Sequence, residues 1–308
     1  MHRRQCSALL SAALACSVAG CGARSDLDIA AAAIVDPPVI VDPPALVSPW
    51  AMRGCDAANR GRGTSPAIID PVELWSFPVT GVSSVSSASP AIAANGTLHL
   101  HIGYSNKLIA VNPEGTLRWE FAGDPTDGGS QQSSPAVGAD GTIYMGSGSH
   151  LAAVDPSGHL RWLLPTSGAV MGSPVVAPDG SIDFGDEGGH LYSASPDGVM
   201  RWSLTLHESI YMHLDPVVAP DGTVYAGIGD TLFAVVEGGV KWTANFNSGT
   251  CCGGRSISIA DDGTILAVGR NGVFAFRPDG SPKWVFEVPA PDDEGLWSAA
   301  SIAPDGTS

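Results

Sequence analysis

The chain of 308 residues contains 44% hydrophobic and 15% charged residues, with 38 glycines and 24 prolines. This composition is typical of a globular protein with short strands and tight turns, and it excludes a disordered chain. The formal net charge of −16 at pH 7 argues against nucleic-acid binding, because phosphate binding depends on a basic surface.

Residues 1–20 are predicted to be an export signal, with basic residues near the start and an apolar centre at 8–18. The stretch Val18-Ala19-Gly20-Cys21 resembles the lipobox of bacterial lipoproteins, which implies that Cys21 is diacylated and becomes the first mature residue. An ordinary signal peptide with an incidental cysteine is the alternative. Acyl chains hold a protein at a membrane by burying methylene groups. Gly22, in place of an aspartate, favours the outer membrane, with the protein facing the periplasm or the cell surface.

Residues 21–49 are predicted to be a tether. Asp36-Pro37-Pro38 and Asp42-Pro43-Pro44 lie six residues apart, and such proline spacing favours an extended, semi-rigid chain. The alternative, a strand packed on the folded domain, is disfavoured because proline cannot donate a ladder hydrogen bond.

Residues 50–308 are built from a repeat of about 40 residues with four short apolar runs, which we interpret as four strands. In the copy at 133–166, Asp140-Gly141 follows the first run and predicts a two-residue hairpin turn. Asp155-Pro156-Ser157-Gly158 follows the third run and predicts a second turn. The five complete copies are at roughly 88–122, 133–166, 172–206, 214–247 and 255–289.

A tryptophan in the fourth run recurs at steps of 40 to 44 residues: Trp75, Trp119, Trp162, Trp202, Trp242 and Trp284. A four-stranded unit repeated in this way predicts an all-β propeller whose blades pack through these tryptophans. Trp75 stands in a lone fourth strand that is a candidate for completing the last blade. The chain stops in the hairpin turn of a sixth copy, at 298–308, so we expect an incomplete or open ring and a fragment or truncated gene model.

The wording of the repeat, with Ser-Pro-Ala-Val at 134–137, Asp-Gly-Thr-Ile-Tyr at 140–144 and Leu-Arg-Trp at 160–162, resembles the PQQ-like repeat. This repeat is known from quinoprotein alcohol dehydrogenases and from the propeller lipoprotein of the outer-membrane β-barrel assembly machinery. The resemblance covers about residues 50–308, and Met52 to Gly61 is similar to the segment that precedes the first blade in this family. It implies the fold more strongly than the function, because the family includes enzymes and scaffolds.

Adjacent cysteines, Cys251 and Cys252, precede the fifth copy, with Arg255 shortly after them. The quinoprotein dehydrogenases carry a cysteine pair of this kind that covers the quinone, so the resemblance implies a cofactor-binding role for the three residues. A bridge within the pair is strained, because consecutive Cα atoms lie ~3.8 Å apart and disulfides usually need ~4.4 Å or more. A bridge from Cys55 to Cys251 or Cys252 is the other possibility in an exported protein.

Polar side chains that depart from the repeat are further candidates. His213 and Asp215 share a strand face at the channel mouth, where they suit a metal or proton transfer, or Asp215 caps backbone N–H groups. Asp183, Asp186 and Glu187 are expected to form a solvated acidic turn, with calcium binding as the alternative. His99 and His101 are expected to face solvent.

The leading prediction is a non-catalytic, membrane-tethered propeller that presents loops or a sheet edge to an envelope protein or polymer, without a cofactor. The alternative is a quinoprotein dehydrogenase that uses PQQ with calcium, or a degenerate relative of one. No carboxylate base or calcium ligand of that family maps onto this chain. A carbohydrate-binding or carbohydrate-cleaving propeller is third, since most tryptophans are committed to blade packing.

Overall fold

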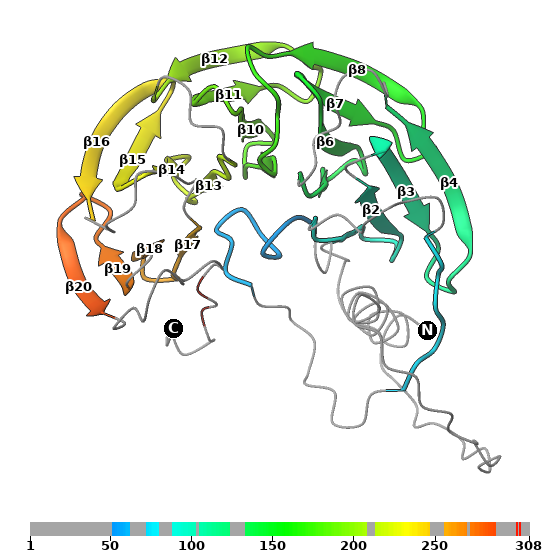
Figure 1. Cartoon of the computed structure of the whole chain (residues 1–308), viewed down its shortest axis with the longest axis horizontal. Helices are drawn as coiled ribbons and strands as arrows, with labels where there is room; N and C mark the ends of the chain where they lie inside the picture. Colours follow the sequence, from blue (N-terminus) through cyan, green and yellow to red (C-terminus); the bar gives the residue numbers. More distant parts are fainter. Residues whose placement is uncertain are drawn as a thin grey trace.

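The computed structural model describes residues 51–61, 72–79, 88–102, 105–123, 133–207, 213–246, 256–269 and 272–287, together with Ala300 and Ile302. The strands in these ranges form five antiparallel sheets of four consecutive strands each. The sheets follow one another along an arc that is open on one side (Figure 1). The predicted all-β propeller with four-stranded blades is therefore confirmed, and its described part is an open arc. No helix in these ranges is long and apolar enough to cross a membrane.

The blades are numbered in chain order. Blade 1 comprises β1 (Ala91–Ile92), β2 (Leu98–Ile102), β3 (Lys107–Val111) and β4 (Leu117–Ala122). Blade 2 comprises β5 (Ala136–Val137), β6 (Ile143–Ser147), β7 (His150–Val154) and β8 (Leu160–Pro165). Blade 3 comprises β9 (Val175–Val176), β10 (Ile182–Gly185), β11 (His190–Ala194) and β12 (Met200–Thr205). Blade 4 comprises β13 (Val217–Val218), β14 (Val224–Ile228), β15 (Thr231–Val236) and β16 (Gly239–Asn245). Blade 5 comprises β17 (Ile257–Ile259), β18 (Ile265–Gly269), β19 (Gly272–Phe276) and β20 (Pro282–Glu287).

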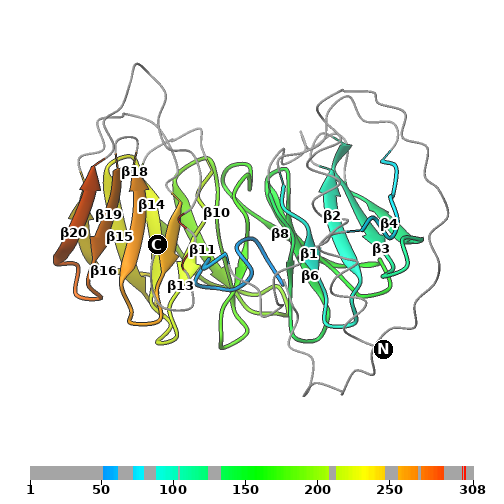
Figure 2. The same ribbon diagram turned by 90° about the horizontal axis from the view of Figure 1, so that it is seen from below.

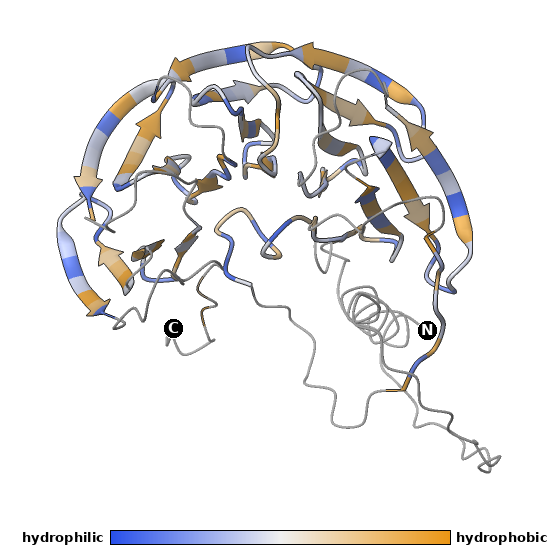
Figure 3. Ribbon diagram, viewed as in Figure 1, coloured by the Kyte–Doolittle hydropathy of each residue, from blue (hydrophilic) through white to orange (hydrophobic). Residues whose placement is uncertain are grey.

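The first strand of each blade lies on the concave side of the arc and the fourth on the convex side (Figure 1). The second strands are buried along their whole length, because a neighbouring blade or chain segment covers each face of the sheet. This explains why they are short, nearly continuous apolar runs. The fourth strands instead alternate hydrophilic and hydrophobic residues (Figure 3).

The turn between the first two strands differs from the expected two-residue turn. In blade 2 the Gly138 N–H donates to Thr142 O and the Gly141 N–H donates to Gly138 O, so the loop has three residues. Only Gly141 has a positive φ, of 82°, which is the pattern of a type I turn followed by a left-handed glycine. The carboxylate of Asp140 accepts the Thr142 N–H at 3.0 Å, and this side-chain bond explains why aspartate recurs before the glycine.

Trp75, Trp119, Trp162, Trp202 and Trp242 pack on the last turn of the next blade, whereas Trp284 in β20 is exposed and makes no such contact among the described residues. The Trp162 ring covers Gly198 in the last turn of blade 3, and its Nε1–H donates to Pro196 O at 3.0 Å. Trp75, Trp119 and Trp242 donate in the same way to Pro113, Pro156 and Pro278. The turn glycine therefore has two requirements, a positive φ and the absence of a Cβ that would enter the ring.

Residues 72–79 have no strand assignment, although they were expected to form a fourth strand. Trp75, Phe77 and Val79 nevertheless pack against the apolar core of blade 1. Trp75 also makes the same contact with blade 1 that Trp119 makes with blade 2. The segment thus occupies the place of a preceding blade's fourth strand.

A belt of hydrogen bonds links the blades where their first strands begin. The Ser89 N–H donates to Ser134 Oγ at 2.9 Å, the Ser134 N–H donates to Ser173 Oγ at 3.1 Å, and the Ser173 N–H donates to Asp215 Oδ1 at 2.6 Å. Each side chain comes from the following blade. The residue just before each first strand therefore needs a short side chain that accepts a hydrogen bond, which is a serine in blades 2 and 3 and an aspartate in blade 4.

Candidate functional site

The concave side of the arc is occupied by residues 51–61, which we call the inner segment (Figures 1 and 2). Its main-chain carbonyls accept N–H groups from the first strands of several blades. The bonds run from Val137 to Ala51, from Val218 to Ala57, from Ile259 to Ala58 and from Ile302 to Arg60, with lengths of 2.7 to 3.1 Å. One short stretch of chain therefore contacts blades 2, 4 and 5 and the start of the sixth copy.

These bonds follow from the strand register. In blade 2, Gly138 bonds to Thr142, so the preceding N–H, that of Val137, points away from β6 toward the concave side. The same N–H in each first strand belongs to an open sheet edge, which is a template for pairing with another chain. The inner segment covers this edge in blades 2, 4 and 5 by main-chain bonding.

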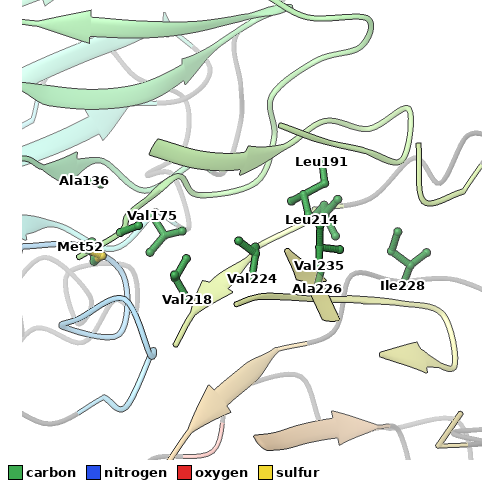
Figure 4. Packing of buried hydrophobic residues seen from close by; sticks show 11 residues of the cluster. Met52, Ala136, Val175, Leu191, Leu214, Val218, Val224, Ala226, Ile228 and Val235 are labelled. Carbon is green, nitrogen blue, oxygen red and sulfur yellow. The ribbon is translucent and has the colours of Figure 1, made fainter. Parts of the chain in front are cut away.

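Side chains fix the inner segment as well. Arg53 forms an ion pair with Asp215, and Arg60 forms ion pairs with Asp56 at 2.6 Å and with Asp261. Met52 is buried beside Val175 of blade 3 (Figure 4). The segment is therefore held at both ends by arginines.

A small pocket lies between the inner segment and blades 3 and 4. Its empty volume, including space open to solvent, is 280 Å³. Arg53, Asp56, Ser173 and Asp215 line it together with apolar residues. Asp215 already pairs with the Arg53 guanidinium and accepts a hydrogen bond from the Ser173 N–H, so these polar groups of the pocket are hydrogen-bonded to one another.

His213 and Asp215 point to different partners. His213 Nδ1 lies 3.1 Å from Met171 O, whereas Asp215 bonds to Ser173 and Arg53. Asp215 thus caps a backbone N–H, which agrees with the capping role that the sequence offered as the alternative to a metal or proton-transfer site. The role of Arg53 was missed by the sequence reasoning. A carboxylate in place of the serines at 134 and 173 was the one signal that a cation stood opposite.

Of the cysteines, the structure describes only Cys55 in the inner segment. Cys55 is half-buried with φ of 80°, and burial, followed by the neighbouring Asp56 carboxylate, raises the pKa of its thiol to about 11. Cys21, Cys251, Cys252 and Arg255 lie outside the described residues. The lipid anchor, the cysteine pairing and the cofactor role of this pair stay predictions.

The expectation of a solvated acidic turn near Asp183 is wrong for its aspartates. Asp186 is fully buried, and it accepts bonds from the Gly168 N–H at 2.9 Å, the Tyr192 hydroxyl at 2.8 Å and the His190 N–H at 3.0 Å. His190 Nδ1 also lies 2.9 Å from it. Asp186 is therefore a structural hub of a tight loop.

Asp183 is buried between blades 3 and 4, on the strand face that Tyr144 occupies in blade 2. Burial raises the pKa of this carboxyl to about 6, although a hydrogen bond from Ser193 partly opposes the shift. Within the described ranges, no three histidine, cysteine or acidic side chains come together in a way that could hold a metal ion.

His99 and His101 were expected to face solvent, and the structure shows that both are buried, with exposed fractions of 3% and 2%. Their strand, β2, is covered by blade 2, so the alternation of side chains along it no longer separates solvent from core. The His99 ring lies 5.6 Å from the Trp119 ring.

Residues 70–183 match the sequence model of a family described as outer membrane protein assembly factor BamB. No curated protein matches the chain at a significant level. Solved structures with similar folds include a europium-containing methanol dehydrogenase, at 14% identity and a TM-score of 0.63. The match covers 78% of this chain and 58% of that one.

Two other solved structures with similar folds are a lyase and a BamB protein. Virginiamycin B lyase from Staphylococcus aureus, in a catalytically inactive form with quinupristin, matches at 16% identity and a TM-score of 0.56, over 69% of this chain and 73% of the lyase. BamB from Moraxella catarrhalis matches at 19% identity and a TM-score of 0.51, over 66% of this chain and 62% of BamB. At these identities the likeness concerns the fold alone. Residues 70–183 therefore match a family of PQQ-like β-propeller repeats, and the later blades continue the same fold.

Proposed function

We propose that this protein is an exported, lipid-anchored β-propeller that binds a cell-envelope protein or polymer and does not catalyse a reaction. The observation that carries the proposal is that polar groups on the concave side are hydrogen-bonded or ion-paired with one another. There the inner segment covers the first-strand edges of blades 2, 4 and 5, and Arg53 and Asp215 neutralise each other.

A catalytic site needs groups that are free to act on a substrate, such as a base within reach of a proton and donors aimed at developing charge. In the described part of the concave side, Asp215 is held by two donors and Asp56 by Arg60. These contacts favour a structural use of the charges over catalysis.

The convex side offers the better binding surface. Its fourth strands are sheet edges, which can receive a further strand by main-chain pairing. Several also carry exposed apolar side chains, namely Leu117, Leu160, Leu163, Val240, Val285 and Phe286. Where such side chains join into a contiguous apolar patch, they mark an interaction site in soluble proteins.

Membrane attachment through Cys21 and the proline-rich tether would place this surface near envelope partners. The match of residues 70–183 to an outer membrane protein assembly factor supports an export-associated role. The choice of the outer membrane and the identity of the partner are part of the proposal.

The competing function is that of a quinoprotein dehydrogenase, supported by the pattern of Cys251, Cys252 and Arg255. A titration of the purified chain with pyrroloquinoline quinone, with and without calcium, separates the two. We expect no saturable change in quinone absorbance or in Tm. A calcium-dependent, saturable shift that is lost in a Cys251→Ser/Cys252→Ser variant contradicts the binding proposal.

Site-directed photo-crosslinking in cells tests the binding surface. A crosslinker at Leu163 or Phe286 on the convex strands is expected to give discrete adducts, because both side chains are exposed on sheet edges. A crosslinker at Ser157, which is exposed in a turn outside the sheet, is the control. Absence of adducts from both convex positions, or equal adducts from the control, counts against this surface.

A further inference from the structure

Two histidines of β2 lie in the interface between blades 1 and 2. His99 is level with Ala91 and Ala110 of its own sheet, and His101 is level with Leu108. Ala91 and Leu108 pack with Ile143 and Met145 of blade 2 in one apolar cluster, so the histidines share a face that blade 2 covers.

No other blade has histidines at these two positions. The position of His99 is taken in the later blades by Tyr144, Asp183, Tyr225 and Leu266. The position of His101 is taken by Gly146, Gly185, Gly227 and Val268. The histidine pair therefore makes the interface between blades 1 and 2 chemically different from the other interfaces.

The hydrogen bonds at this interface fit neutral rings. His101 Nδ1 lies 2.8 Å from the carbonyl of Ser133 in blade 2, and since a carbonyl only accepts, Nδ1 carries the ring proton. His99 Nδ1 is buried and has no hydrogen-bond partner among the described residues, and His101 Nε2 is buried as well, with the Asn106 side chain as the one polar neighbour that favours its protonated form. The hydroxyl of Thr97, next to them in sequence, is in the same situation as His99 Nδ1. A proton added to His101 Nε2 would therefore be a buried donor.

The surrounding charges oppose protonation. Arg118 of β4 repels a positive charge on His99. Lys107 of β3 and Glu120 of β4 form an ion pair at 3.5 Å within blade 1, so these two charges offset each other. Blade 2 faces the two rings with Ile143, Met145 and the uncharged Ser133. Burial, and then Arg118, lowers the pKa of His99 to about 4, and burial lowers the pKa of His101 despite its hydrogen bonds to Ser133 and Asn106.

We propose that His99 and His101 form an acid-sensitive latch: blade 1 stays packed on blade 2 while both rings are neutral, and protonation releases blade 1 before the other blades. An isolated buried charge has a high cost, so the protonated rings are accommodated only when the interface opens. His101 then also gives up its bond across the interface to Ser133.

The opposite chemistry at another interface makes the release selective. Between blades 3 and 4 the buried titrating group is Asp183, whose pKa is raised to about 6, so acid neutralises it. Lowering the pH from 7 to 5 therefore favours opening of the interface between blades 1 and 2, whose open state alone binds the proton, and it removes charge from the interface between blades 3 and 4.

Hydrogen exchange measured by mass spectrometry on the full chain at pH 7.5 and pH 5, corrected for intrinsic rates, tests the latch. Below a pH of about 6.5 the open state binds a proton that the closed state excludes, so closing becomes less favourable as pH falls toward 4. We expect the protection of β2 and β3 to fall roughly 30-fold for His99 alone, and that of β14 and β15 to stay within a few-fold.

The matched variants are His99→Tyr/His101→Gln and His159→Gln. In the first variant, the tyrosine at position 99 copies Tyr144 of blade 2, whose ring lies 5.8 Å from the Trp162 ring. The glutamine at position 101 keeps an uncharged hydrogen-bond donor for the Ser133 carbonyl. The second removes a histidine whose side chain is 79% exposed. The pH-dependent loss should disappear in the first variant and persist in the second. If the loss is absent in the native chain, or equal in both variants, the latch does not exist.

An independent measurement does not depend on the double variant folding. In an NMR titration of the native chain, the ring signals of His99 and His101 should stay those of neutral imidazoles down to pH 5.5 while blade 1 is folded. Titration of either ring near 6.5 in the folded protein would overturn the proposal, since it would show that the closed interface accepts the charge.

Discussion

A single strand position, the one beneath each fourth-strand tryptophan, shows how one side chain sets the properties of a blade interface. Tyr144 and Tyr225 place a ring 5.8 and 5.7 Å from the tryptophan ring of their blade, and each is neutral at physiological pH. Asp183 and His99 occupy the same position in other blades with groups that titrate. A buried titrating group ties the stability of its interface to pH.

Replacing Asp183 with Asn is expected to stabilise the protein at pH 8. The carboxyl has a pKa of about 6 in the folded chain and 3.8 in the unfolded chain, so its contribution is fully present below about 3.8 and is lost as pH rises through 6. The gain of Asp183→Asn should approach about 2 to 3 kcal/mol at pH 8 and vanish near pH 4. Urea unfolding of both proteins at the two pH values measures the difference. A gain that is the same at both pH values would show that charge burial is not its cause.

At the scale of the blade, the repeating element is a tryptophan on one blade and a glycine in the last turn of the next. The ring needs a flat surface, and the carbonyl that receives its Nε1–H lies two residues before the glycine. Since each blade contacts mainly its neighbours, this joint carries much of the cohesion of the arc.

Gly198→Ala is expected to destabilise the chain more than Gly222→Ala. The two glycines have nearly the same φ, 81° and 83°, so the cost of a left-handed backbone, about 1 kcal/mol, is shared. A Cβ at Gly198 would lie 2.7 Å from the Trp162 ring, whereas a Cβ at Gly222 meets nothing within 4 Å. We expect a further loss of about 1 to 3 kcal/mol at Gly198, measured by thermal or urea unfolding. Equal losses would mean that the tryptophan moves aside without cost.

For the molecule as a whole, the inner segment is the element that joins blades far apart in sequence. Contacts along the arc connect each blade to the next, but residues 51–61 bond to blades 2, 4 and 5 at once. An open arc lacks the mutual support of a closed ring, so a segment of this kind fixes the positions of its blades relative to one another.

Asp215→Ser and Arg53→Ala test this role. A serine restores the side chain that receives the backbone N–H in blades 2 and 3, so the hydrogen-bond belt should persist while Arg53 loses its partner. Both groups are partly exposed, and we expect a coupling of only about 0.5 to 1 kcal/mol in a double-mutant cycle.

The same variants should increase hydrogen exchange at Val137 and Val218, whose N–H groups the inner segment covers. The matched control is Arg161→Ala, which breaks an ion pair with Asp140 within blade 2. If the control raises exchange at these sites as much as Arg53→Ala does, the inner segment has no special part in linking the blades.

Much of the fold was predictable because it is local. Each strand is a short apolar run, the first turn of each blade has an aspartate or asparagine before its glycine, and the tryptophan recurs once per blade. The turn type was wrong in detail, because aspartate in blade 2 uses its carboxylate to cap Thr142 and does not itself adopt a positive φ. That choice depends on a side-chain bond that an Asp-Gly pair alone does not reveal.

Burial was the harder question. His99, His101, Asp183 and Asp186 are polar residues at positions where strand alternation or a turn suggested solvent, and all four are buried. In a propeller both faces of a blade are covered, so the polarity of a side chain no longer indicates which face meets water. Only the neighbouring blade decides it.

The sequence by itself determined the repeat, the order of strands in a blade and the residues at the turns, since these depend on contacts between residues close together in the chain. The tertiary structure decided what fills the concave side and which charges meet there. Arg53 and Asp215 are 162 residues apart, and their pairing exists only because the arc brings the start of blade 4 to the inner segment.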